Sequence, residues 1–535
     1  MNGNVTNAPG AGTISIHPRL FPAREMIEDG KYEQAAQYLI GFLRQNPDNA
    51  DALAMLGQTA NRLGALGQAE HFMRKAIQMG ARAYENRFQL ATILNQQARP
   101  VPSARMLEAL QQERPDPNTR LLLASIYEKI GESERAREMY GELAQQNPNH
   151  APTLIAYGHS LRSAGQVDEA VAAYRQAIAA DDGFGDAWWG LASIKAKILT
   201  DEDIETMRAA LAIAIDERNI APLHFALARA LHDRKQHAEA FGHYKLGNDL
   251  RAKSLDYNAE ELSGEVSETA RMVDAAYLAK MPQAPVGDAV PVFIISLPRS
   301  GSTLLEQMLG SHSQIEPVGE LPYASAILRS FMEMATRRGK LSVPQAITAL
   351  SDEQAAVFGR DYMERAEVHR TEGTRFFLDK LPQNWSNVLF IRKILPQARF
   401  IDIRRPAMDC CWSNFTQSFT SAHPSSFTLE DMGRAYADNV RLMAHFDAVA
   451  PGMIHHVDYS ALVEDPRTQI GAALDYLGLE WEDDILQFHQ SDRVVRTPSS
   501  EQVRRPLNRD GMEVWRPYAE YLGPLRDTLG DLAEA

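Results

Sequence analysis

Cysteine is scarce in this sequence. Among 535 residues there are two cysteines, the adjacent pair Cys410 and Cys411. Neighbouring cysteines in regular structure rarely bridge, so the fold does not rely on the disulfide framework that staples many small secreted domains. We therefore expect a protein of a reducing compartment, the cytoplasm, in which both cysteines pack within a helix rather than serve as redox partners.

Long apolar runs are missing as well. No stretch of about 20 consecutive apolar residues occurs, which argues against a membrane-spanning helix. The first residues, 1–22, are rich in Asn, Gly and Pro and contain no apolar segment of signal-peptide length. We expect a flexible amino-terminal segment and no secretory signal.

The chain also lacks an excess of positive charge, because its formal net charge is -15. Such a balance opposes broad attraction to nucleic acid or anionic lipid, which needs Lys and Arg gathered on one face. Any anionic ligand must be captured locally. No His and Cys cluster has the spacing of a zinc site, so no metal is expected.

An internal repeat fills the first half of the sequence. Ala35 and Ala69 are 34 residues apart, as are Ala136 and Ala170, which is the period of tetratricopeptide repeats. Small residues are needed there because two antiparallel helices approach closely. The same register places further small residues at Gly57, Ala91, Ala124 and Gly158.

The array of repeats is predicted to cover residues 23–250. Its third unit is degenerate, with Ser103 at the alanine position and prolines interrupting the turn at 99–102, and an irregular stretch is expected near 200–220. Such repeats stack into a solenoid whose concave face commonly holds a peptide or partner protein. A purely structural role, such as dimerisation or shielding of the next domain, is the alternative.

A change of pattern after a helical linker, 251–289, marks a second domain at 290–535. The apolar run 290–297 is typical of a strand buried on both faces of a parallel sheet. Two more short strands are predicted at 376–378 and 400–403, with an amphipathic segment, 386–395, between them. We predict an open α/β sheet with its ligand crevice at the carboxyl ends of the strands.

A candidate anion-binding loop follows the first of these strands. Gly301 lets the backbone approach an anion, and the start of the next helix supplies amide donors. The loop differs from a Walker A sequence, which needs an early Gly and a Lys before the hydroxyl. A surface turn that caps a helix is the alternative. The candidate ligands are Arg299, Ser300, Gly301, Ser302 and Thr303.

A second candidate anion site follows the strand at 400–403. Arg405 lies just after that strand, and Ser413 comes eight residues later. If a helix begins near Ala407, Ser413 can face the same crevice as Arg405. The fork of donors on Arg405 could then hold a second phosphate together with the Ser413 hydroxyl.

These two motifs resemble the phosphoadenosine-phosphosulfate-dependent sulfotransferases, in particular the tyrosylprotein sulfotransferase branch. The resemblance covers about residues 291–518 and implies an α/β fold that is P-loop-like, with a strand, a phosphate-binding loop and a helix. It also implies that the loop at 299–303 cradles the 5'-phosphosulfate of 3'-phosphoadenosine 5'-phosphosulfate. Arg405 and Ser413 would then grip the 3'-phosphate.

The resemblance implies roles for further residues. Glu320 matches the catalytic base, Lys380 a catalytic lysine, and Tyr459 a tyrosine that contacts the cofactor. Ser500 falls in a segment, 499–506, that is similar to one closing over the nucleotide. With Arg299, Lys380 would stabilise charge on the departing phosphate. Each residue also has a purely structural alternative: a solvated helix start for Glu320, a surface ion pair with Asp379 for Lys380, and packing of an aromatic ring for Tyr459.

The sequence departs from the family at several places. Val514 stands where a lysine usually precedes the late tryptophan, so Arg509, Arg516 or no residue makes that phosphate contact. Gln417 replaces an arginine of the tyrosylprotein branch. The family's lumenal anchor is missing, and its amino-terminal region has no counterpart to the repeat array.

We predict a sulfotransferase that moves the sulfuryl group from 3'-phosphoadenosine 5'-phosphosulfate to an acceptor hydroxyl, with the repeats binding acceptor or partner. Protein tyrosine is the leading acceptor by resemblance, but a glycan, lipid or small alcohol would use the same base and donor. The alternatives are a repeat scaffold with a vestigial nucleotide-binding domain, and an ATP-dependent phosphotransferase. The oligomeric state is left undetermined.

Overall fold

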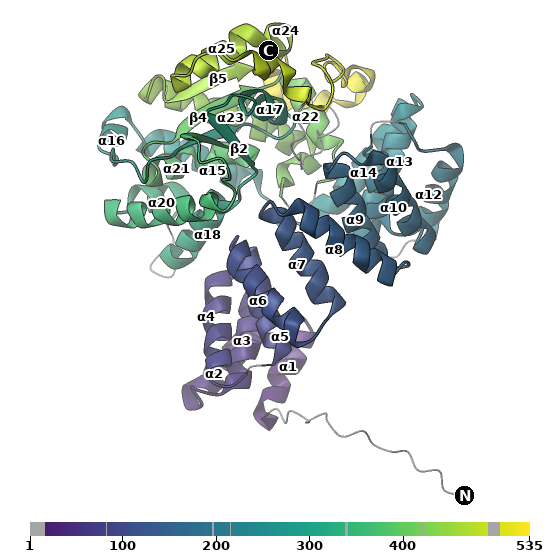
Figure 1. Cartoon of the computed structure of the whole chain (residues 1–535), viewed down its shortest axis with the longest axis vertical. Helices are drawn as coiled ribbons and strands as arrows, with labels where there is room; N and C mark the ends of the chain where they lie inside the picture. Colours follow the sequence, from purple (N-terminus) through teal and green to yellow (C-terminus); the bar gives the residue numbers. More distant parts are fainter. Residues whose placement is uncertain are drawn as a thin grey trace, which may run out of the picture. The chain divides into compact units, whose positions relative to one another are not determined.

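The structure is a computed structural model that describes residues 17–81, 83–194, 197–213, 216–336, 341–419, 422–490 and 503–534. The chain divides into two compact units, Met1–Ile126 and Tyr127–Ala535, which are described separately. Figure 1 traces the elements of both along the chain.

The first unit is helical throughout its described residues. Pairs of antiparallel helices pack closely at the small residues of the repeat: a Cβ atom on Gly57 would lie 3.3 Å from the Ala69 carbonyl oxygen of the neighbouring helix. The bounds are η1 (Pro18–Leu20), α1 (Phe21–Glu28), α2 (Tyr32–Gln45), α3 (Ala50–Arg62), α4 (Leu66–Gln78), α5 (Tyr84–Gln96) and α6 (Pro100–Glu113).

The degenerate third unit keeps its place in the array. Pro100 is the first residue of α6 rather than a break in it, because the first helical position needs no amide donor. Ser103 is fully buried, and its hydroxyl donates to the Ala91 carbonyl oxygen at 2.6 Å. A serine at the alanine position is therefore accommodated by one hydrogen bond between the paired helices.

The second unit begins with the rest of the helical array. Its helices are α7 (Pro117–Lys129, which starts in the first unit), α8 (Ser133–Gln146), α9 (Ala151–Ser163), α10 (Val167–Ala180), α11 (Gly185–Ala192), α12 (Asp201–Ile213), α13 (Glu217–Asp233) and α14 (His237–Lys253).

Helix α12 lies within the stretch that was expected to be irregular, so that expectation is wrong for 201–213. The helix begins with a reciprocal cap: the Asp203 amide donates to the Thr200 hydroxyl, and the Thr200 amide donates to the Asp203 carboxylate at 2.7 Å. This pattern satisfies two amides at the start of the helix.

The remainder of the second unit contains a five-stranded sheet in the order β2-β3-β1-β4-β5, in which every neighbouring pair is parallel. The predicted fold class, a tetratricopeptide-type helical array followed by a parallel α/β domain, is thereby confirmed. The strands are β1 (Val290–Ile295), β2 (Ile315–Gly319), β3 (Phe376–Asp379), β4 (Arg399–Arg404) and β5 (Ile454–Asp458).

Helices connect and cover the strands. They are α15 (Ala259–Met272), α16 (Ala275–Ala279), α17 (Ser302–Leu309), α18 (Tyr323–Thr336), α19 (Val343–Thr348), α20 (Asp352–Glu367), α21 (Val388–Ile394), α22 (Ala407–Phe415), α23 (Leu429–Val449), α24 (Tyr459–Glu464), α25 (Pro466–Leu477) and α27 (Gly523–Leu529). Short 3-10 helices include η2 (Pro382–Asn387), η3 (Pro424–Phe427), η4 (Asp483–Gln490), η5 (Arg516–Tyr521) and η6 (Gly530–Ala533).

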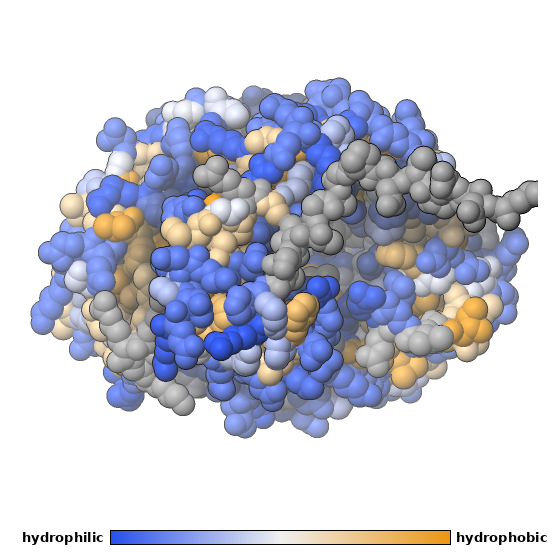
Figure 2. Space-filling model, turned by 90° about the horizontal axis from the view of Figure 1, so that it is seen from below, coloured by the Kyte–Doolittle hydropathy of each residue, from blue (hydrophilic) through white to orange (hydrophobic). Residues whose placement is uncertain are grey.

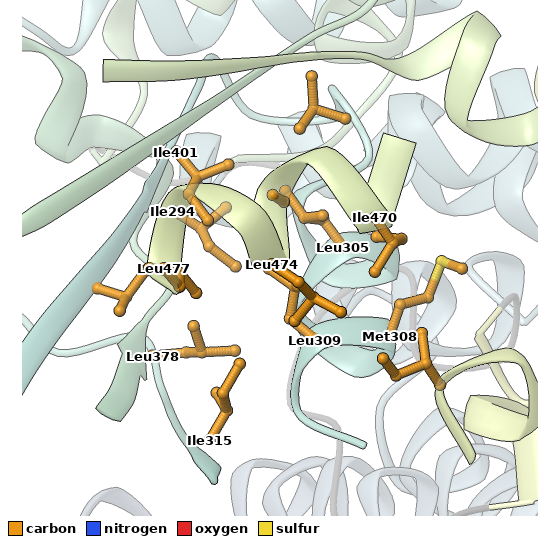
Figure 3. Packing of buried hydrophobic residues seen from close by; sticks show 14 of the residues in the cluster. Ile294, Leu305, Met308, Leu309, Ile315, Leu378, Ile401, Ile470, Leu474 and Leu477 are labelled. Atoms are coloured by element: carbon orange, nitrogen blue, oxygen red, sulfur yellow. The ribbon is translucent and has the colours of Figure 1, made fainter. Parts of the chain in front are cut away.

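Alternate side chains of the strands build two separate layers of core. On one face, Ile294 and Ile401 pack with Leu305 of α17 and Leu474 of α25, as Figure 3 shows. On the other face, the rings of Phe293 and Phe400 stack with their centroids 5.7 Å apart. The sheet is covered on both faces, so its carboxyl-terminal edge is left for a ligand.

The last two repeat helices share a core with the α/β part of the second unit. Phe241 of α14 stacks on Tyr521 at 4.7 Å, and the Tyr518 hydroxyl lies 2.7 Å from Nδ1 of His232 on α13. Helix α15 also packs on this part, because the Ser263 hydroxyl donates to Asp438. The predicted boundaries after residues 22, 250 and 289 stay predictions.

Among the described residues, no helix has the length and apolar character needed to cross a membrane. Figure 2 shows one face of the molecule, on which hydrophilic residues predominate and apolar residues form small separate groups.

Candidate active site

The loop between β1 and α17 takes a shape that ordinary residues resist. Gly301 has a φ of 97°, in the left-handed region, and Arg299 also has a positive φ, of 66°. A Cβ atom on Gly301 would lie 2.3 Å from the ring of Tyr459. The loop therefore requires glycine at 301, and Tyr459 both packs against it and lines the pocket beside it.

Two guanidinium groups meet at this loop. Arg405 follows β4, the neighbour of β1, and its Nη1 donates to the Arg299 carbonyl oxygen at 3.0 Å. Nε of Arg299 donates to the Ser413 hydroxyl of α22 at 3.2 Å. Burial, and secondly the charge of Arg405, lowers the pKa of Arg299 to about 10. Arg299 still carries its charge at neutral pH.

Arg405 is held by groups on several sides. It donates to the Gly511 carbonyl oxygen, lies 5.4 Å from the centre of the Tyr459 ring, and has Asp409 at 3.6 Å. Its Nε is buried and has no hydrogen-bond partner among the described residues. Burial raises the pKa of Asp409, whose carboxylate accepts from the backbone at Glu513.

Glu320 and Lys380 form an ion pair at the ends of the neighbouring strands β2 and β3. The Lys380 side chain is 1% exposed, whereas that of Glu320 is 44% exposed. Glu306 of α17 also approaches Lys380, at 3.9 Å. Burial by itself would lower the pKa of Lys380, but the two carboxylates outweigh it and the pKa is raised.

For Lys380 the alternative of a surface ion pair is wrong, whereas for Glu320 the alternative of a solvated helix start is only half right, because its side chain is 44% exposed. Lys380 is buried and pairs with Glu320, so it is not in a surface ion pair with Asp379. Glu320 follows β2 directly and precedes α18 by three residues, so it does not start a helix. Asp379 is itself fully buried, and burial raises its pKa to about 7.

A pocket of about 290 Å³ opens at this edge of the sheet. Of the predicted site residues, it is lined by Arg299, Gly301, Ser302, Thr303, Glu320 and Tyr459. The others lie directly behind them: Ser300 is 3.3 Å from Sγ of Cys410, and Lys380, Arg405 and Ser413 contact lining residues. Ser500 lies outside the described residues.

The pocket has walls that the sequence did not reveal. Beyond Glu320 it is lined by Leu381, Pro382, Phe419 and His423. The rings of Phe419 and His423 meet edge to face at 4.5 Å, and Gln383 lies 3.1 Å from Nδ1 of His423. Burial lowers the pKa of His423 to about 4, so this imidazole is neutral near pH 7. The two residues come after α22, where no motif pointed to them.

The late segment 503–511 supplies another wall, including Val503, Asn508 and Gly511. Within the same unit, Nη2 of Arg504 donates to the Ser163 carbonyl oxygen at the end of repeat helix α9, at 3.3 Å. One segment thus touches both the helical array and Arg405. Arg509 and Arg516 are the two residues that could replace the lysine missing at position 514. Arg509 pairs with Glu464 at 3.0 Å, and Arg516 pairs with Glu513.

Residues 291–483 match the model of the sulfotransferase family. Models of the tetratricopeptide repeat match residues 23–85 and 156–196, and 119–150. The resemblance predicted from the motifs, to sulfotransferases and to tetratricopeptide repeats, is confirmed. Residues 291–483 thus match the sulfotransferase family and follow, in the sequence, regions that match tetratricopeptide repeats.

Individual proteins are similar to this chain at low sequence identity. An uncharacterized protein of Aquifex aeolicus (strain VF5) is 28% identical over 79% of this chain and 56% of its own length. Protein-tyrosine sulfotransferase 1 of Danio rerio is 23% identical over 42% of this chain and 65% of its own length. The chain thus spans less than two thirds of either relative.

Among solved structures, the sulfotransferase domain of the Synechococcus PCC 7002 olefin synthase is 19% identical, with a TM-score of 0.29. That alignment covers 45% of this chain and 98% of the solved domain.

Proposed function

We propose that this chain transfers the sulfuryl group from 3'-phosphoadenosine 5'-phosphosulfate to an acceptor hydroxyl. The observation that carries the proposal is the meeting of Arg299 and Arg405, whose strands are neighbours, beside the Glu320 and Lys380 pair. An anionic group bound at Arg299 would lie in the same pocket as the Glu320 carboxylate, which can accept a proton.

The residues present fit a nucleotide with phosphate groups at two positions. The loop at 299–303 offers amides, hydroxyls and the helix start to a 5'-phosphosulfate. Arg405 and Ser413 are proposed to hold the 3'-phosphate. The unpartnered Nε of Arg405 supports this role, since a buried donor is expected to have an acceptor in the working state.

Sulfuryl transfer, like phosphoryl transfer, needs little covalent help from the protein, so positioning and electrostatics supply most of the rate. The bond from sulfur to the acceptor oxygen forms as the bond from sulfur to the phosphate oxygen breaks. In this proposal Glu320 accepts the proton of the acceptor hydroxyl. Lys380 and Arg299 stabilise the negative charge that develops on the departing phosphate.

The ion pair also defines what must change during turnover. Oε1 of Glu320 accepts from Lys380, so the proton would go to the second oxygen of the carboxylate, and the ion pair with Lys380 would lose its negative partner. Lys380 is buried, and Glu306 at 3.9 Å remains as its second carboxylate. Because a buried charge is costly without a counter-ion, Glu306 would keep Lys380 protonated when Glu320 engages the acceptor.

The acceptor is proposed to be a phenolic hydroxyl, with protein tyrosine as the leading candidate. The wall beyond Glu320 supports this choice, because Leu381, Pro382 and Phe419 are apolar and His423 is neutral. Such a wall suits a flat, uncharged ring better than a hydrated sugar. The repeats are proposed to hold the protein that carries the tyrosine, as repeat arrays commonly bind peptides.

Both cysteines are free in the structure, which supports work in the cytoplasm. No nucleic acid partner is proposed, given the net charge.

The test of the acceptor is a transfer assay with radiolabelled donor. The full chain is incubated with ³⁵S-labelled 3'-phosphoadenosine 5'-phosphosulfate and, separately, a tyrosine peptide, 2-naphthol, an oligosaccharide and a primary alcohol. Label is expected on the peptide or on 2-naphthol. Label on the oligosaccharide alone would reject the phenolic acceptor, and no transfer to any of them would favour a scaffold without turnover.

A further inference from the structure

The backbone that carries Glu320 forms a short arch, Gly319 to Leu321, clamped at both ends to the end of β3. The Lys380 amide donates to the Gly319 carbonyl oxygen at 2.9 Å. The Leu321 amide donates to Oδ1 of Asp379 at 3.2 Å. Gly319 has a φ of 79°, and the register of β2 against β3 shifts between Pro317 and Gly319. The arch therefore leaves the regular ladder, and these two bonds fix it.

Asp379 connects the arch to the core. Its side chain is fully buried, and its Oδ2 accepts from the Tyr362 hydroxyl at 2.7 Å. Tyr362 lies on α20, is also fully buried, and packs against Phe293 of β1 with ring centroids 5.6 Å apart. A line of contacts thus runs from the centre of the sheet through Tyr362 and Asp379 to the residue after Glu320.

This carboxylate is costly to bury, because an acid in an apolar interior is tolerated only when it is hydrogen-bonded. Asp379 is not among the residues that line the pocket. It can affect chemistry there only through the residues it holds. Displacement of a reacting group by about 1 Å can lower a rate about 100-fold, so the position of the arch matters for Glu320.

We propose that Asp379 and Tyr362 are positioning residues that hold the Gly319–Leu321 arch, and with it the Glu320 carboxylate, in its place beside Lys380. Only the expected effect on the rate rests on the proposed function. The effect on the arch itself is independent of it.

A matched control exists at the opposite end of β2. Glu316 is a buried carboxylate that accepts from the backbone amides of Thr371 and Glu372. Like Asp379 it lies in the sheet and outside the pocket lining, but its hydrogen bonds go to Thr371 and Glu372 rather than to the arch, and Arg370 lies 3.7 Å from it. The variants are Asp379→Leu, which removes both acceptor oxygens, Asp379→Asn, which keeps one for the Leu321 amide, Tyr362→Phe, and Glu316→Leu as the control.

Hydrogen exchange of the full chain measures the arch directly. In Asp379→Leu, the Leu321 amide is expected to exchange at least about tenfold faster, because its hydrogen bond is lost. Glu316→Leu should leave that amide unchanged and speed exchange near Thr371. Unchanged exchange at Leu321 in Asp379→Leu would overturn the proposal.

The transfer rate measures the consequence. Asp379→Leu is expected to lower kcat about 10-fold to 100-fold, with binding of 3'-phosphoadenosine 5'-phosphate changed less than about twofold. Asp379→Asn should have a kcat close to that of the wild type. The kcat of Tyr362→Phe should lie between those of Asp379→Leu and the wild type. Glu316→Leu should have the wild-type kcat per folded molecule. Equal losses in Asp379→Leu and Glu316→Leu would overturn positioning in favour of a general stability effect.

Failure of the proposed function and failure of the positioning role give different results. If the wild-type chain transfers no sulfate, the proposed function fails, while the exchange of the Leu321 amide still decides whether Asp379 holds the arch. If the wild type is active and Asp379→Leu is equally active, the proposed function stands and the positioning role is rejected.

Discussion

The two sides of the pocket use positive charge in different ways. On the side of β1 and β4, which we call the anion wall (Arg299, Arg405 and Ser413), the arginines donate to a hydroxyl and two backbone carbonyls, and the carboxylate of Asp409 lies 3.6 Å from Arg405. On the side of β2 and β3, the acid-base wall (Glu306, Glu320 and Lys380), one lysine is flanked by two carboxylates. The sheet order puts each pair of strands side by side.

The difference separates binding from proton transfer. The anion wall sets two guanidinium groups against the carboxylate of Asp409, so it retains an attraction for phosphate or sulfate. A lysine between two carboxylates is already compensated, so the acid-base wall adds little net attraction. It instead presents a carboxylate, 44% exposed, that can exchange partners. The comparison therefore predicts that substitutions in the two walls alter different measurements.

The largest effect is expected from Glu320→Gln in the acid-base wall. Loss of the proposed base should reduce the transfer rate about 100-fold to 10,000-fold. The Kd for 3'-phosphoadenosine 5'-phosphate, followed by calorimetry, should stay within about twofold. A variant with normal turnover would remove the base from the mechanism, and one with weakened nucleotide binding would erase the distinction between the walls.

The next effect is expected from Arg405→Ala in the anion wall. A lost charged hydrogen bond is worth about 1.5 to 3 kcal/mol, which weakens nucleotide binding about 10-fold to 150-fold. Arg399→Ala, an exposed arginine at the other end of β4, is the matched control and should bind normally. Similar nucleotide affinities in the two variants would show that the nucleotide does not recognise Arg405 specifically.

A smaller effect is expected from Gly301→Ala, which tests the shape of the anion wall rather than its charge. The added methyl group meets the Tyr459 ring in a backbone conformation that alanine resists, a strain of about 1 to 3 kcal/mol. Nucleotide binding should weaken about tenfold and the melting temperature should fall. Adding Tyr459→Ala relieves the contact but not the backbone strain, so recovery should be partial, and complete recovery would contradict a strained loop.

The last effect concerns pH and should arise from Asp379, next to Lys380 of the acid-base wall. Burial raises the pKa of Asp379 to about 7 from an unfolded value of 3.8. Between these values the folded chain binds more protons than the unfolded one, so Asp379 makes the free energy of unfolding fall as pH rises from about 4 to 7. The Arg299 pKa, about 10, adds nothing in this window.

Denaturant unfolding of wild type and Asp379→Asn across that range checks this expectation. As the pH rises to about 7, the free energy of unfolding of the wild type should fall relative to that of the variant. Above about pH 7 the two curves should run parallel. Parallel curves over the whole range would place the Asp379 pKa near its ordinary value.

The anion wall could be predicted from the sequence because its residues sit in short local patterns. The loop at 299–303 lies between an apolar strand and an apolar helix, and Ser413 is fixed relative to Arg405 by one helix. The fold class followed from similar local signals, the 34-residue period and the short apolar runs. The cap formed by Thr200 and Asp203 was also visible in the sequence, and it would have predicted α12.

The acid-base wall and the acceptor side depend on contacts between distant residues. Glu306 stands among Leu305, Met308 and Leu309, where nothing local indicates that it meets Lys380. Asp379 directly precedes Lys380 in the sequence, but its partner Tyr362 belongs to α20, the helix that precedes β3 in the chain. The link from Arg504 to Ser163 spans most of the second unit. Packing alone brings these residues together, and no local spacing encodes it.

The most direct test of the central claim is calorimetric titration of the full chain with 3'-phosphoadenosine 5'-phosphate and, separately, with ATP. We expect clear preference for the 3'-phosphorylated nucleotide, and loss of that preference in Arg405→Ala. Preference for ATP, or no binding of either nucleotide, would contradict this expectation and leave the repeat array as the main clue to what this chain does.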